Sequence, residues 1–186
     1  EMGKTLSNYG ALIISDEVQT GWGRTGEHFW GYQAHGIIPD MLTFAKGVGN
    51  GITLAGIVAR AEIMENITAL NFSTFGGNPL SAVAGLATFR EVTNKNMQAN
   101  AKIMGARLKD GLEAVAEETP WIGDLRGRGL MVALEIVGES KENSLDEPYP
   151  ERAAEFLEAC KDFGLLLGKG GVFGNVIRIT PMLNVS

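Results

Sequence analysis

The sequence predicts an α/β fold, because short apolar runs bounded by turn residues alternate with longer stretches of helical periodicity. The predicted strands are residues 11–15, 41–45, 54–59, 130–137, 165–167 and 176–180. The predicted helices are residues 29–35, 60–70, 80–92, 95–118 and 151–163, with the end of an earlier helix in residues 1–10. The start of the long helix at 95–118 is the predicted boundary between two domains, residues 1–96 and 97–186.

Capping residues and apolar content support the elements of the first domain. Gly36 suits the end of the first short helix, and the pair Asn78 and Pro79 is typical of a helix start. The strand 54–59 and the helix 80–92 are apolar enough that we expect both to be largely buried.

The second domain has its own local signals. Apolar residues at three- and four-residue steps make 95–118 an amphipathic helix whose methionines belong to a core. Residues 121–129 contain three glycines and predict a turn before the next strand. Residues 138–150 are polar and predict a surface loop, and 168–175 predict a glycine-rich loop. A proline before 151–163 and a glycine after it bound the last helix.

Composition and charge exclude several functional classes. The chain of 186 residues is 45% hydrophobic and 20% charged, which is typical of a globular protein. Its net charge of −6 disfavours nucleic acid and anionic membranes as partners. The single cysteine, Cys160, fits a reducing compartment, and His28 and His35 lack the spacing of metal ligands. We therefore expect no metal, and a cytoplasmic location, or a mitochondrial one if a transit peptide precedes Glu1.

Two predicted strand ends carry groups capable of cofactor chemistry. Asp16 follows the strand 11–15, and Lys46 follows the strand 41–45. Ligands of open α/β sheets bind at such ends, where an amine can form a Schiff base with an aldehyde and a carboxylate can hold a protonated pyridine nitrogen. From the residues alone, Lys46 could equally be a solvated lysine and Asp16 a turn cap.

Two other positions also allow two interpretations. Thr74 precedes a helix start, where a hydroxyl and free amides can bind phosphate, although spacing alone favours a simple helix cap at Asn78. Arg178 interrupts an apolar strand, where a guanidinium needs a partner. That partner could be a substrate carboxylate or a carboxylate of the protein.

Four motifs in order resemble the signature blocks of class III pyridoxal-phosphate-dependent aminotransferases. They are LIISDEVQTGWGRTG, PDMLTFAKGVGNG, STFGGNP and VIRITP. The pattern is most similar to the branch of alanine–glyoxylate aminotransferase 2 and the omega-aminotransferases, and it covers essentially the whole chain. The resemblance implies fold type I, with part of the large mixed-sheet domain and most of a small C-terminal α+β domain.

The resemblance also implies roles for the cofactor-binding residues. Lys46 would hold pyridoxal 5'-phosphate (PLP) as a Schiff base, and Asp16 would pair with the pyridine nitrogen. Gln19 would contact the phenolic oxygen of the ring, and Val18 belongs to the same cofactor-binding set. Thr74 would bind the phosphate across the interface of a homodimer or a dimer of dimers.

For the reaction, the resemblance implies transfer of an amino group from an amino acid or omega-amine to a keto acid of the pyruvate or glyoxylate type. Arg178 would bind the α-carboxylate of the substrate. Two alternatives remain: another PLP enzyme of the same fold, such as an aminomutase or decarboxylase, or a non-catalytic α/β module. Because other family motifs would lie upstream of Glu1, we expect the chain to be incomplete and inactive alone.

Overall fold

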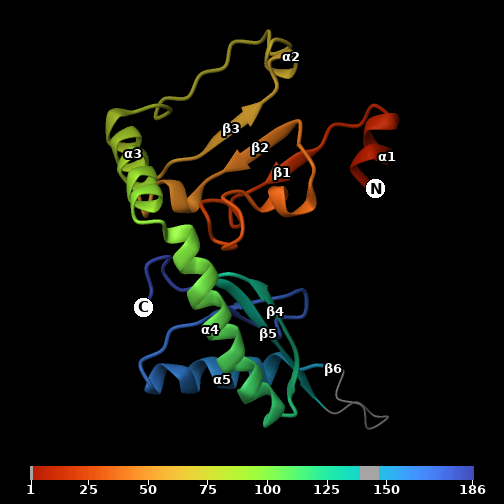
Figure 1. Ribbon diagram of the computed structural model, residues 1–186, viewed down its shortest axis with the longest axis vertical. Helices are drawn as coiled ribbons and strands as arrows, with labels where there is room; N and C mark the ends of the chain where they lie inside the picture. Colours follow the sequence, from red (N-terminus) through yellow and green to blue (C-terminus); the bar gives the residue numbers. More distant parts are fainter. Residues whose placement is uncertain (1, 139–146) are drawn as a thin grey trace. The chain divides into compact units, whose positions relative to one another are not determined.

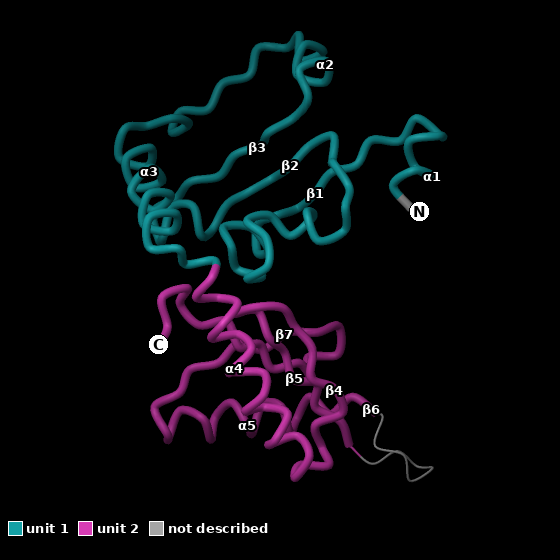
Figure 2. The backbone as a smooth tube through the Cα atoms, viewed as in Figure 1, with its two compact units in different colours: residues 1–98 teal, residues 99–186 magenta. Residues whose placement is uncertain are grey.

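The computed structural model describes residues 2–138 and 147–186. The chain folds into two compact units, Glu1–Gln98 and Ala99–Ser186 (Figure 2). Each unit combines helices with a β-sheet, which confirms the predicted α/β class. The assignment of these units to a large and a small domain of a longer protein stays a prediction.

Unit 1 is built on a mixed three-stranded sheet of order β1-β2-β3 (Figure 1). Strands β1 and β2 are parallel, and β3 is antiparallel to β2. Its elements in chain order are α1 (Met2–Asn8), β1 (Ile14–Asp16), η1 (Gly31–His35), β2 (Met41–Phe44), η2 (Lys46–Val48), β3 (Gly56–Ala59), α2 (Ala61–Met64) and α3 (Pro79–Asn94), where η denotes a 3-10 helix.

The capping signals in unit 1 are confirmed. Gly36 ends η1 in the left-handed conformation with φ 61°. Helix α3 has Pro79 in its first turn, and the Asn78 side chain accepts a 3.0 Å hydrogen bond from the amide of Ser81. Short local signals of this kind need no distant partner, which is why the sequence alone revealed them.

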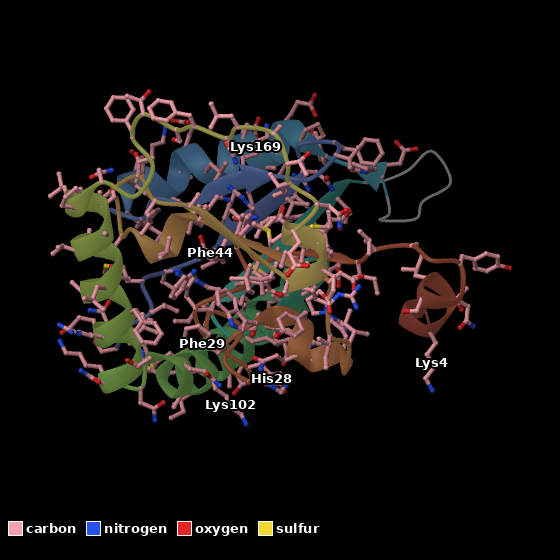
Figure 3. All side chains as sticks on the ribbon, turned by 90° about the horizontal axis from the view of Figure 1, so that it is seen from above. Lys4, His28, Phe29, Phe44, Lys102 and Lys169 are labelled. Carbon is pink, nitrogen blue, oxygen red and sulfur yellow. The ribbon has the colours of Figure 1, made fainter. Side chains whose placement is uncertain are left out.

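An aromatic cluster joins the loop after β1 to strand β2 and helix α3. The ring of Trp22 lies 5.5 Å from Phe29, 5.3 Å from Trp30 and 5.8 Å from Phe44, all edge-on. Phe89 of α3 completes the cluster at 6.5 Å from Trp22. Phe29 and Phe44 are labelled in Figure 3. Edge-to-face packing of large rings gives this part of unit 1 its core.

Unit 2 contains a four-stranded antiparallel sheet of order β4-β5-β8-β7, with a short strand β6 paired to β5. Its elements are α4 (Met97–Glu117), which begins at the unit boundary, β4 (Ile122–Arg128), β5 (Met131–Gly138), β6 (Glu147–Pro148), α5 (Pro150–Asp162), β7 (Gly168–Gly170) and β8 (Val176–Ile179). Leu134, Ile136 and Ile177 of the sheet pack with Ala153 of α5 in a buried core. One sheet face is thus apolar and covered.

Two loops predicted from glycines are strands. Residues 122–128 form β4, which pairs with β5, although the sequence predicted a turn. Residues 168–170 form β7 at the sheet edge, where the sequence predicted a loop and placed the strand at 165–167. Pairing of β4 with β5, and of β7 with β8, stabilises these glycine-rich segments against their low strand propensity. In the predicted loop 138–150, residues 139–146 lie outside the described part of the chain.

Other predictions in unit 1 were wrong about length or burial. The helix expected at 60–70 is limited to α2, and Leu70 is 99% exposed. Strand β3 and helix α3 also expose residues expected to be buried, among them Val58 at 59% and Leu80 at 71%. Periodicity identifies an apolar face, but it does not identify what covers that face.

Across residues 2–138 and 147–186, none of the helices combines the length and apolar content needed to cross a bilayer. The same described residues contain no group of three or more His, Cys, Asp or Glu side chains arranged to hold a metal ion.

A close approach between helix α4 and the β4–β5 turn yields a stability prediction. A Cβ atom at Gly105 would collide with the backbone of Gly129, whereas one at Gly111 meets nothing within 4 Å. Gly105→Ala should lower the free energy of unfolding by about 1–3 kcal/mol, because the helix must move off the turn. Gly111→Ala on the same helix should raise it by about 0.5–1 kcal/mol. Urea unfolding of the two variants checks this, and equal midpoint shifts would contradict it.

Candidate active site

The parallel pairing of β1 and β2 brings two predicted site residues to one edge of the unit 1 sheet. Asp16 is the last residue of β1 and lies opposite Thr43 of β2. Lys46 begins η2, two residues after β2 ends at Phe44. The carboxyl ends of parallel strands lie at the same end of the sheet, so Asp16 and Lys46 both lie at that end.

Lys46 occupies an unusual backbone conformation. Its φ is 48°, in the left-handed region that non-glycine residues rarely adopt. The short helix that it begins is held by the buried side chain of Val48, which faces Gly85 of helix α3. The Lys46 side chain is exposed in this chain. Rare conformations held by surrounding structure cluster at functional sites.

Asp16 is an exposed carboxylate oriented by two hydrogen bonds. The amide of Val18 donates to Oδ1 at 3.1 Å, and the hydroxyl of Thr43 donates to the same oxygen at 3.3 Å. The cap interpretation of Asp16 is therefore realised at Oδ1. Within the described residues Oδ2 receives no hydrogen bond, so it remains an acceptor for an external donor. Val18 is half-buried beside it, and Gln19 is exposed.

Glu17 is a buried carboxylate that the sequence did not single out. It is 1% exposed, and four donors bind it. The Ser15 hydroxyl (2.9 Å) and the Tyr32 amide (2.7 Å) donate to Oε1, and the Thr20 hydroxyl (2.6 Å) and the Gly31 amide (2.7 Å) donate to Oε2. No sequence signal connects Glu17 with an amide fourteen residues away.

Two opposing effects act on the pKa of Glu17. Burial by itself would raise the pKa, because it disfavours the charged form. The hydrogen bonds from Thr20, Gly31, Tyr32 and Ser15 favour the carboxylate and outweigh burial, so the pKa lies below its ordinary value of 4.5. Glu17 is therefore ionised at neutral pH inside the protein.

Trp22 connects the loop after β1 with the turn that carries Lys46. It is buried and, like Lys46, has a positive φ, of 65°. A Cβ atom on Gly47 would lie 3.5 Å from Cδ1 of the Trp22 ring. The indole Nε1 is buried and has no hydrogen-bond partner among the described residues. The edge-on contacts described above support the interpretation of Trp22 as a packing residue.

Thr74 lies on a different loop of unit 1. It is exposed, in the turn just before helix α3. Asn78 fastens that turn by donating to the carbonyl of Phe75 at 2.9 Å, and Ser81 donates to the carbonyl of Thr53 at 2.9 Å. The cap interpretation of this loop is realised at Asn78. The phosphate-binding role of Thr74 stays a prediction.

Arg178 belongs to unit 2, whereas the other predicted site residues belong to unit 1. It is exposed on β8, so the sequence argument from a buried guanidinium was wrong. Its side chain runs beside strand β7, where a Cβ atom on Gly170 would lie 3.1 Å from its Cδ. It forms no ion pair with residues 2–138 or 147–186, which leaves its guanidinium available to a carboxylate.

Comparison with known proteins identifies a family. The family model described as Aminotransferase class-III matches residues 4–186. Alanine–glyoxylate aminotransferase 2 homolog 2 of Arabidopsis thaliana, named as mitochondrial, is 44% identical over 96% of this chain and 37% of its own length. An alanine/serine racemase of Pyrococcus horikoshii is 40% identical over 98% of this chain and 37% of its own length.

A solved structure supports the fold type. The amine transaminase from an uncultivated Pseudomonas species, in its PLP-bound form, superimposes with a TM-score of 0.87 and 28% identity. It covers 100% of this chain, which in turn covers 43% of that protein. The fold type I prediction is confirmed. The chain spans about two-fifths of the length of the proteins that it matches.

The lowered pKa of Glu17 predicts a pH-dependent contribution to stability. A carboxylate with a lower pKa in the folded state stabilises the protein above the unfolded value of 4.5, and this contribution is lost as the pH falls through the folded value. At neutral pH, Glu17→Gln should lower the free energy of unfolding by about 1–3 kcal/mol, since buried donors lose their acceptors. Below the folded-state pKa of Glu17, the free energies of unfolding of wild type and Glu17→Gln should converge.

Urea unfolding at a series of pH values measures this difference. The control is Glu91→Gln, which removes an exposed ion pair with Lys95 and should change the free energy of unfolding by no more than about 0.5 kcal/mol. A difference between wild type and Glu17→Gln that does not vary with pH would contradict the assignment of the charge.

Proposed function

The chain belongs to the class III aminotransferase family, and we propose that the protein containing it transfers an amino group from an amino acid or omega-amine to a keto acid of the pyruvate or glyoxylate type. The observation that carries this proposal is the parallel β1–β2 register, which supports a shared site for Asp16 and Lys46. Similarity to a named aminotransferase of A. thaliana supports the reaction class.

The cofactor of this family is PLP, and the residues present fit it. PLP needs an amine for its aldehyde carbon and an acid for its ring nitrogen. The exposed amine of Lys46 and the unengaged Oδ2 of Asp16 meet these needs at one sheet edge. When bound, PLP supplies a ring that accepts the electron pair released at the substrate carbon.

Each residue then has a defined task. Lys46 would hold the cofactor covalently through Nζ and, once displaced by the amino donor, take the proton from the amine-bearing carbon of the substrate. Asp16 would keep a proton on the pyridine nitrogen through a charge-assisted hydrogen bond to Oδ2. Val18 and Gln19, on the turn after Asp16, would contact the ring.

The remaining roles concern phosphate, substrate and assembly. Thr74 would bind the cofactor phosphate of a second subunit, so the active form would be a homodimer or a dimer of dimers. Arg178 would bind the substrate carboxylate with its planar guanidinium. The mitochondrial name of the A. thaliana relative supports a mitochondrial location, with a cytoplasmic one as the alternative.

A second candidate function is a PLP enzyme of different chemistry on the same fold. The relative from P. horikoshii is named a racemase, and it is nearly as similar to this chain as the aminotransferase is. If Lys46 removed the proton and a proton then returned to the opposite face of the same substrate carbon, the configuration would invert without amino transfer. The same site residues serve both reactions, so analysis of the products must distinguish amino transfer from racemisation.

The covalent role of Lys46 is testable in the full-length protein. After loading with PLP and borohydride reduction, mass spectrometry should find the cofactor on the peptide that contains Lys46. Lys46→Ala should abolish this label and the reaction, because it removes the amine to which the Schiff base is assigned. Lys95→Ala, which removes an exposed lysine of the same unit, should retain both. Labelling of a different lysine would contradict the assignment.

Product analysis separates the two candidate functions. With an amino donor and pyruvate or glyoxylate, the full-length protein should yield a new amino acid and a new keto acid in equal amounts, with ping-pong kinetics. A racemase would instead invert the donor without any acceptor. Inversion that matches or exceeds amino transfer in rate would favour the second candidate, and release of carbon dioxide would indicate a decarboxylase.

A further inference from the structure

The carboxylate of Glu17 has no part in the chemistry proposed above, although it lies between two site residues. Burial alternates along this segment: Asp16 is exposed, Glu17 is buried and Val18 is half-buried. The Glu17 side chain therefore enters the interior of unit 1 where the neighbouring Asp16 side chain leaves it. Burial of an ionised group is costly unless hydrogen bonds compensate for its desolvation.

The donors to Glu17 come from three separate segments. Ser15 belongs to β1, Thr20 to the turn after it, and Gly31 and Tyr32 to the start of η1. The amide of Glu17 also donates to the carbonyl of Thr43 at 2.9 Å. The hydroxyl of that same β2 residue donates to Asp16 Oδ1. Glu17 and Asp16 are thus held against one residue of the neighbouring strand.

Two glycines, Gly31 and Gly21, lie close to Glu17. A Cβ atom on Gly31 would lie 3.2 Å from Glu17 Oε2 and 2.7 Å from Cβ of Thr20. A Cβ atom on Gly21 would lie 2.9 Å from the Glu17 carbonyl oxygen. The two glycines let the backbone approach the carboxylate closely, and each position would need a local shift to accept a side chain.

We propose that Glu17 is a positioning residue, whose ionised carboxylate fixes the end of β1 and the following turn so that Asp16 presents Oδ2 to the cofactor. This inference rests on the proposed function and deepens it. Charge is essential to the role, because all four partners donate. A glutamine would offer one oxygen and an NH2 group, and that NH2 group would face the donors of Gly31 and Thr20 or those of Tyr32 and Ser15.

A double-mutant cycle in the full-length protein tests the proposal. The dissociation constant of PLP is measured by absorbance titration for wild type, Glu17→Gln, Asp16→Asn and the double variant. Glu17→Gln should weaken binding by about tenfold when Asp16 is present and by less than about twofold in the Asp16→Asn background. The loss of effect is expected because Glu17 acts through Asp16.

Further variants separate positioning from general stability. Val92→Ala truncates a buried side chain of helix α3, and it should leave the dissociation constant of PLP within about twofold of wild type. Glu17→Asp keeps the charge on a shorter side chain and should bind PLP with intermediate affinity. Without cofactor, hydrogen exchange at the amides of Gly31 and Tyr32 should be faster in Glu17→Gln than in Val92→Ala. If Glu17→Gln does not fold, Glu17→Asp and Gly31→Ala replace it in the cycle.

Two results would overturn the positioning role while leaving the proposed function intact. One is an affinity for PLP that is unchanged in Glu17→Gln. The other is a loss of PLP affinity on Glu17→Gln that is equal in the wild-type and Asp16→Asn backgrounds. Failure of the proposed function is distinguished by the other variants: wild type would not bind PLP, or Asp16→Asn would bind it as well as wild type does. The positioning role would then fall with it.

Discussion

The parallel pairing of β1 with β2 is the constraint on which the candidate site depends. Because Asp16 lies opposite Thr43, both strands end at one edge of the sheet, and the loops that follow begin side by side. A slip of one residue in this register would turn Asp16 to the opposite face and would carry Glu17 out of the interior. The buried carboxylate resists such a slip, since four donors would lose their acceptor. The β1–β2 register thus places the Glu17 carboxylate in the interior, and the hydrogen bonds of that carboxylate stabilise the register.

The parts of the fold that the sequence predicted are those set by local chemistry. The strand before Lys46, the caps at Gly36 and Asn78, and the last helix all have signals within a few residues. Strands β4 and β7 were missed because their glycines have low strand propensity, and only pairing with β5 and β8 makes them strands. Tertiary context determined those elements.

The candidate site shows the same division between local and distant signals. The motifs around Asp16 and Lys46 could be read from the sequence, because each is a strand end followed by turn residues. Glu17 could not be found in this way, because two of its partners lie in η1 and only the folded chain brings them near. The exposure of Val58 and Leu80, which the sequence predicted to be buried, has a different origin. Apolar content predicts that a face is covered, but it does not identify the covering segment, and this chain spans 37% of the length of its A. thaliana relative.

The backbone at Lys46 shows how the fold maintains a costly conformation at this edge. A non-glycine residue in the left-handed region costs about 1–2 kcal/mol. Full burial of a valine contributes about 1.5–3 kcal/mol, and Val48, two residues later, is 5% exposed against helix α3. The second term is large enough to offset the first. The sharp turn ends β2 at Phe44, so the chain leaves the sheet at the amine instead of extending past it. Packing of Val48 on α3 thereby helps to keep Lys46 beside the end of the neighbouring strand.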